Sequence, residues 1–150
     1  MVKGLKRLQR QMTRTIPRAV VAATIKAMEK SADEIVASMK GFVPVDDGDL
    51  RDSIGWTWGE PPQGAVIVSK SSATPGSGLR ITIFAGNQDA FYARFVEFGT
   101  APHVAGRDGV AHPGAGAHPF FFPGYRLNKK RAKSRITRTM RKAIREGAGR

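Results

Sequence analysis

The stretch that decides the fold is residues 15–41, TIPRAVVAATIKAMEKSADEIVASMKG. Apolar residues recur in it at the spacing of one helical face; they are Val21, Ile25, Met28, Ala32, Ile35 and Met39. Thr15 suits the N-cap, and Pro17 suits the first turn, where its missing N–H costs nothing. Gly41 and Pro44 are typical of a helix end. The pattern predicts a long helix over 15–40 whose apolar face packs against the rest of the chain.

The segment before this helix, residues 1–14, is basic and keeps Leu5, Leu8 and Met12 at helical spacing. We expect it to be a basic arm or a short helix that becomes ordered on a partner. No secretory signal is expected, because no apolar core follows the basic residues.

The segment after the long helix reads as β-structure. Ile54, Trp56 and Trp58 alternate as they would in a half-buried strand, and two further apolar runs follow, separated by turn-rich sequence. The sequence predicts strands near 53–58, 65–69 and 79–86, forming an antiparallel meander that packs on the long helix.

The next stretch, FYARFVEFGT at 91–100, predicts a short amphipathic helix. Phe91, Phe95 and Phe98 fall at helical spacing, and Gly99 is a stop signal. Burial of this aromatic face explains the phenylalanines but not Glu97. A carboxylate among aromatic side chains is costly unless it has a partner.

The C-terminal third begins with residues 101–118, which are rich in glycine and lack periodicity, as in a long flexible loop. HPFFFPGY, 118–125, ends the loop. From residue 126 the apolar positions Ala132, Ile136 and Met140 share one side with Ala143 or Ile144, so a basic amphipathic helix is predicted, ending near Gly147. The expected fold is a single α+β domain over 15–146, in which a long helix and a basic C-terminal helix pack on a small antiparallel sheet, and 147–150 form a tail.

The net charge of +13 is unevenly distributed along the 150 residues. Residues 1–30 and 126–150 are strongly basic, whereas 31–125 hold six Lys/Arg against ten Asp/Glu. Basic ends favour contact either with nucleic-acid phosphates or with acidic protein surfaces. The chain has no cysteine, so disulfides and thiolate metal sites are excluded. No apolar run approaches the roughly 20 residues of a membrane span.

Candidate catalytic and metal-binding residues are sparse. The acidic cluster lacks the spacing of a calcium loop and is better explained as a turn in which Asp47 or Asp49 caps a helical turn carrying Leu50 and Ile54; it consists of Asp46, Asp47, Asp49 and Asp52. His103, His112 and His118 are scattered over the glycine-rich loop, which does not favour a zinc site. No nucleophile elbow is present. We therefore expect no enzyme activity, metal or cofactor.

Three motifs together resemble one family. VPVDDGDLRDSI (43–54), YARFVEFGT (92–100) and HPFFFPGYR (118–126) are similar, in this order, to segments of the small head–tail joining proteins of long-tailed phages. Asp47 stands where threonine is usual in that family, and Gly124 stands where alanine is usual. The segment between the second and third motifs is longer in this chain than is expected for the family.

The resemblance implies a structural, non-enzymatic role in the virion neck or tail, with assembly in the host cytoplasm. It implies a ring, expected to contain six copies, that completes the tail and joins it to the head. The implied partners are neighbouring neck proteins on the stopper or adaptor side, the tail terminator or tail tube protein, and the DNA in the channel, without a membrane. Alternatives are the tail terminator that caps the tube and, in another class, a basic DNA-binding accessory protein.

Interface and structural residues follow from the motifs as a hypothesis: Asp46, Gly48, Leu50, Arg51, Glu97, Phe98, Gly99, Thr100, Pro119, Phe120, Phe121 and Phe122. The basic face of the last helix adds Lys129, Lys130, Arg131, Lys133, Arg135 and Arg138. For Glu97 we expect an arginine partner, Arg51 or Arg94 within the chain or an arginine across a ring interface, and Arg51 is preferred.

Overall fold

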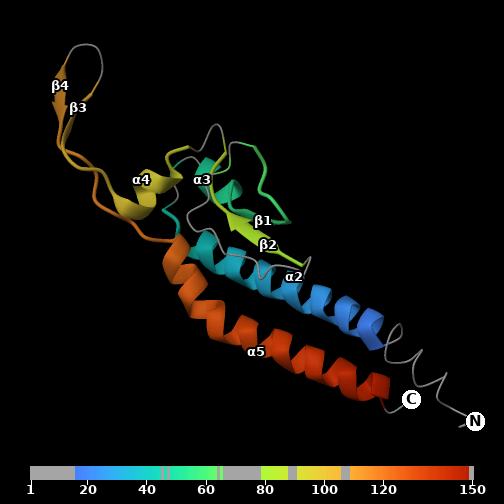
Figure 1. The fold of residues 1–150 in the computed structure, drawn as a ribbon. Helices are drawn as coiled ribbons and strands as arrows, with labels where there is room; N and C mark the ends of the chain where they lie inside the picture. The colour runs from blue at the N-terminus through green and yellow to red at the C-terminus, as the bar shows by residue number, and fades with distance from the viewer. Residues whose placement is uncertain are drawn as a thin grey trace, which may run out of the picture. The chain divides into compact units, whose positions relative to one another are not determined.

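The computed structural model describes residues 16–44, 46, 48–63, 65, 79–87, 91–105 and 109–148. Its elements are α2 (Ile16–Phe42), α3 (Asp49–Asp52), β1 (Gly55–Trp58), β2 (Ile81–Phe84), α4 (Ala93–Phe98), β3 (His103–Ala105), β4 (Val110–His112) and α5 (Phe121–Ala148), shown in Figure 1. This is a mixed α+β fold that is mostly helical, so the predicted class is confirmed. Helix α2 begins one residue after, and ends two residues beyond, the predicted 15–40.

The chain divides into two compact units, and the first comprises residues 1–32 and 128–150. Its described part consists of the beginning of α2 and the larger, C-terminal part of α5. Small side chains at Ala27, Ala32 and Ala143 are buried there. Arg135 of α5 donates from Nη1 to the Ser31 hydroxyl of α2 over 3.0 Å. The two helices therefore contact each other through small residues, which permit a close approach.

The second unit, residues 33–127, holds the larger core. Its buried apolar side chains are Ile35, Met39, Val43, Leu50, Ile54, Ala85, Ala93, Phe120 and Phe121. Met39 and Phe120 are the largest fully buried side chains. The apolar stripe predicted for the long helix is confirmed at Ala32, Ile35 and Met39, whereas Val21, at its other end, is exposed.

A two-stranded antiparallel sheet pairs β1 with β2, with Trp56 opposite Ile83. The Trp56 indole Nε1 donates to Asp33 Oδ1 over 2.7 Å, which ties the sheet to α2. Two of the three predicted strands are confirmed. Of the third, 65–69, Ala65 is described outside any strand, and 66–69 lie outside the described residues. The predicted arm 1–14 also lies outside them.

Two predictions for the C-terminal third are wrong. Residues 101–118 contain a β-hairpin, in which β3 and β4 pair antiparallel, rather than a loop without regular structure. Helix α5 begins at Phe121, so it includes the FFPGY stretch that we placed before it. Pro123 is compatible with this early start because the first N–H groups of a helix have no intrahelical acceptor. No helix among the described residues has the length and apolar character that crossing a membrane requires.

Candidate functional site

The Glu97 carboxylate caps the N-terminus of α5. Its Oε2 accepts hydrogen bonds from the backbone N–H groups of Phe120 and Phe121, both at 2.8 Å, and its Oε1 accepts from Phe122 N–H at 3.1 Å. Glu97 is only 3% exposed. The first N–H groups of a helix lack acceptors and carry partial positive charge, so a buried carboxylate is stabilised there. Helix α4 is therefore fixed to the start of α5.

The predicted intrachain arginine partner of Glu97 is wrong. Arg51 and Arg94 are both exposed, and the carboxylate is instead buried against α5. In the described part of the chain its hydrogen-bond partners are three backbone N–H groups. These donors satisfy the charge without the desolvation of a second ion.

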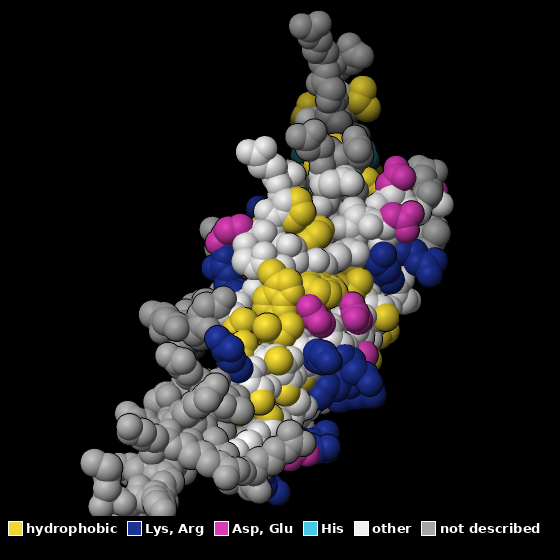
Figure 2. Space-filling view, turned by 90° about the vertical axis from the view of Figure 1, so that its right-hand side faces the viewer, with side chains coloured by type: hydrophobic (Ala, Val, Ile, Leu, Met, Phe, Trp, Pro, Cys, Tyr) yellow, Lys and Arg dark blue, Asp and Glu magenta, His cyan; other side chains and the backbone are white. Residues whose placement is uncertain are grey.

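The phenylalanines of α4 and the residues just before it point outward. Phe91, Phe95 and Phe98 are 63%, 51% and 56% exposed, whereas the buried side of the helix carries Ala93 and Glu97. The prediction that these aromatic residues face the core is therefore wrong. They share one side of the helix, as their spacing indicated, but that side is exposed and Glu97 lies on the buried side. We call Phe91, Phe95 and Phe98 the aromatic face. Figure 2 shows a view of the molecule in which hydrophobic side chains reach the surface among charged ones.

The segment that follows α4 folds back, and backbone hydrogen bonds attach its returning part to the C-terminal end of α4. Thr100 and Ala115 exchange backbone hydrogen bonds of 2.9 and 3.2 Å, and His118 N–H donates to the Val96 carbonyl over 2.8 Å. Gly99 has a φ of 71°, and a Cβ on it would lie 2.7 Å from the Ala115 carbonyl oxygen. Only glycine fits this position without strain. The hairpin base is thus bound to α4.

The hairpin itself projects from this base (Figure 1). His103 and His112 stack across the two strands with ring centroids 5.0 Å apart, and Val104 and Val110 are exposed. His118 lies outside both strands, on the return to α5. No group of three histidine or acidic side chains among the described residues has a metal-binding arrangement.

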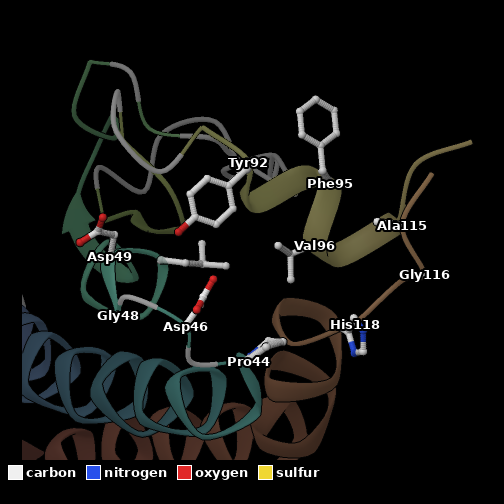
Figure 3. A pocket seen from close by; sticks show the side chains of 11 residues that line it. Pro44, Asp46, Gly48, Asp49, Tyr92, Phe95, Val96, Ala115, Gly116 and His118 are labelled. Carbon is white, nitrogen blue, oxygen red and sulfur yellow. The ribbon is translucent and has the colours of Figure 1, made fainter. Parts of the chain in front are cut away.

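A pocket of about 440 Å³ lies beside the aromatic face (Figure 3). All three motifs contribute to it. The first motif supplies Pro44, Asp46, Gly48, Asp49 and Leu50, the second supplies Tyr92, Phe95 and Val96, and the chain returning from the hairpin supplies Ala115, Gly116 and His118. Segments far apart in sequence therefore converge on one recess.

The pocket is apolar with an acidic side. Leu50 is buried, Tyr92 and Val96 are half-buried, and the Asp46 and Asp49 side chains are exposed. In Figure 3 the Asp46 and Tyr92 side chains project toward the middle of the pocket, whereas Phe95 points away from it. This arrangement suits a ligand that combines apolar groups with positive charge.

The acidic turn of the first motif differs from its prediction in one detail. Gly48 is the N-cap of α3, and Asp49 is the first helical residue, without a side-chain capping bond among the described residues. Asp47 lies outside them. Leu50 and Ile54 are buried, as expected of this turn. Because Asp49 does not cap the helix, its carboxylate remains available at the surface.

The predicted site residues fall into three groups. Asp46, Gly48 and Leu50 line the pocket, whereas Arg51 does not. Glu97 and the three phenylalanines Phe120–Phe122 form the cap of α5, with Phe98 contacting Phe122 at 6.0 Å between ring centroids. Gly99 and Thr100 form the hairpin base, and Pro119 is exposed just before α5.

Most of the predicted basic residues lie at the surface of α5, and some residues that line the pocket were not predicted. Along α5, all six predicted basic residues except the half-buried Arg135 are exposed; the five are Lys129, Lys130, Arg131, Lys133 and Arg138. Sequence reasoning missed Tyr92, Val96 and Asp49 as lining residues. Their place in the first and second motifs was the available signal.

Comparison with known families places the chain among phage tail components. The chain belongs to the HK97-gp10-like family, described as "Bacteriophage HK97-gp10, putative tail-component", whose profile matches residues 6–99. The match runs from before α2 through α4 and ends at Gly99, the first residue of the hairpin base. No curated protein and no solved structure matches the chain. The resemblance to a phage head–tail family is therefore confirmed, and the protein is a virion tail component.

Proposed function

We propose that this tail component forms a ring that completes the head-proximal end of the tail and joins it to the head. The observation that carries the proposal is the pair of exposed apolar features in one unit, the aromatic face and the hairpin. Three large aromatic side chains exposed within eight residues are characteristic of a surface that is covered in an assembly.

The two features have different shapes, which favours a ring over a symmetric dimer. The aromatic face lies beside a recess, whereas the hairpin is a projection. A contact between unlike patches is heterologous, and repeated rotation by such a contact closes a ring. An isolated two-stranded hairpin is at best marginally stable in water. Contact with a neighbouring molecule would therefore stabilise this one.

We infer that the protein acts through assembly rather than catalysis. The most deeply buried carboxylate among the described residues, Glu97, accepts three hydrogen bonds from α5 and thereby has a structural task. A general acid or base must instead be within reach of a substrate proton. The pocket's exposed carboxylates, Asp46 and Asp49, suit ionic contacts with a protein partner.

Electron microscopy of particles assembled without this protein tests the proposal. Filled heads lying apart from complete tails are the expected result, together with a mass by light scattering that corresponds to six copies for the purified ring. Tails of uncontrolled length would indicate the alternative role of a terminator that caps the tube. Joined particles of normal appearance would overturn the tail-completion role.

Contact with the DNA that passes through the ring is a second element of the proposal. The nine exposed cations of α5 give it a positive surface, and helices of this kind bind phosphates without sequence preference. Binding of duplex DNA at increasing salt tests it, because phosphate contacts weaken in proportion to the number of cations engaged. Binding to DNA combined with normal head–tail joining would favour the DNA-binding accessory protein instead.

A further inference from the structure

The acidic pocket has a matching segment within the same sequence. Residues 1–14 carry five cations and no acidic residue: Lys3, Lys6, Arg7, Arg10 and Arg14. Leu5, Leu8 and Met12 lie among them at the spacing of one helical face. We propose that the pocket binds this basic arm of a neighbouring copy. The inference rests on the proposed ring and names the contact between its subunits.

The chemistry of the two partners is complementary. The pocket offers the apolar surface of Leu50, Tyr92 and Val96, and it offers the Asp46 and Asp49 carboxylates at its surface. The arm supplies leucine side chains for the apolar part and flanking cations for the two carboxylates. An amphipathic segment in a groove is a recurrent mode of recognition, and the charges orient it and speed its docking.

The arm precedes α2 in the sequence, and the pocket lining begins at Pro44, after the end of this 27-residue helix. The proposed ring places another copy beside each subunit, so we assign the arm to the neighbouring copy. Disulfide cross-linking distinguishes this arm from the arm of the same chain.

The contact is also suited to a closed ring. The arm and the pocket are different surfaces, so a contact between them in two copies is heterologous, and each subunit gives an arm to one neighbour and receives one from the other. An exposed pair of ions alone contributes little, but the apolar residues of the arm are desolvated together with it.

Disulfide cross-linking tests the inference directly, because the chain has no cysteine of its own. Leu8→Cys combined with Val96→Cys is expected to give a ladder of cross-linked chains under oxidising conditions, because Val96 lines the pocket. Leu8→Cys with Glu60→Cys is the matched control, since Glu60 is exposed but does not line the pocket. The cross-linking is done on the purified oligomer, or within particles if the chain assembles only there.

Charge exchange supplies an independent readout. Asp46→Lys with Asp49→Lys is expected to weaken self-association roughly tenfold. Adding Lys6→Glu and Arg10→Glu to the same chain is expected to restore most of it. An unchanged association for the first variant, or no recovery for the second, would contradict the ionic part of the contact.

The outcomes separate this inference from the proposed function. A cross-link confined to single chains would show that the arm binds its own pocket, and no cross-link at all would remove the arm as occupant. Either result, in a protein whose loss still separates heads from tails, overturns the inference and leaves the tail-completion role intact. Joined particles in the absence of the protein would overturn that role instead.

Discussion

Met39 of α2 and Gly124 of α5 approach so closely that a Cβ on Gly124 would lie 2.6 Å from the Met39 Cγ and 3.0 Å from its backbone nitrogen. Both residues are buried, and Met39 is fully inaccessible. The contact accounts for glycine at this position, because the helices meet here at a distance that excludes even a methyl group.

Gly124→Ala is expected to lower the free energy of unfolding by about 1–3 kcal/mol, since overpacking forces rigid backbone apart. Gly41→Ala is the matched control: it also lies in a helix, and a Cβ there has no described atom within 4 Å. It should be neutral or slightly stabilising because alanine favours helix. Urea unfolding of both variants measures the difference, and equal stabilities would show that α2 and α5 can separate at this point without cost.

Glu97→Gln is expected to destabilise the protein by about 1–3 kcal/mol, because a neutral amide replaces a carboxylate that accepts three hydrogen bonds. One of the two amide positions becomes a donor and opposes a backbone N–H. Glu60→Gln at the surface should change stability by less than about 0.5 kcal/mol.

Chemical denaturation provides the measurement for both glutamate variants. Near-ultraviolet circular dichroism reports in addition on the aromatic residues around the α5 cap. If Glu97→Gln retained the full stability of the wild type, the carboxylate would not be needed to hold α4 against the start of α5.

Most of the helices and strands could be predicted from the local pattern of apolar residues, but the candidate site could not. The 3.6-residue spacing located α2, and alternation located β1 and β2, since these signals depend on a single face. The same spacing located α4 near Phe91–Phe98 but assigned its faces in reverse. Periodicity shows that Phe91, Phe95 and Phe98 share a side, but it cannot show that a neighbouring helix terminus attracts Glu97 more strongly than the core attracts the phenylalanines.

The hairpin was missed for a related reason. Its strands have three residues each and lie in glycine-rich sequence without alternation, so no window carries the signal of a strand. Its position depends on hydrogen bonds between Thr100 and Ala115, which are 15 residues apart. The pocket likewise requires three distant motifs to meet, and only their joint resemblance to one family indicated that they act together.

Gly99→Ala is expected to disrupt the hairpin base, because its φ of 71° and ψ of 179° lie in a region that essentially only glycine adopts, at a cost of roughly 1–3 kcal/mol for other residues. The added methyl group would also meet backbone atoms at 2.7 and 2.9 Å. Gly109→Ala is the control for a positive φ without a close approach, since its φ is 65° and no described atom lies within 4 Å of its Cβ.

Hydrogen exchange of the Thr100 and Ala115 amides measures opening of the base in the two glycine variants. Faster exchange is expected in Gly99→Ala and nearly unchanged exchange in Gly109→Ala. Equal protection in both would mean that the close approach at Gly99 is relieved by local movement.

Phe95→Ser is expected to separate assembly from folding. The side chain is about half exposed in the single chain, at 51%, so its loss should cost little stability, whereas Phe120, at 0%, is part of the core. Phe120→Ser should therefore destabilise the protein by about 3–5 kcal/mol, as large core truncations do. Light scattering and thermal unfolding of each variant supply the two measurements.

For Phe95→Ser the expected result is a stable chain that no longer forms rings, because an aromatic anchor of the interface is missing. A Phe95→Ser protein that still assembled with wild-type affinity would show that the aromatic face is not covered in the ring, and the hairpin would then be the surface to test.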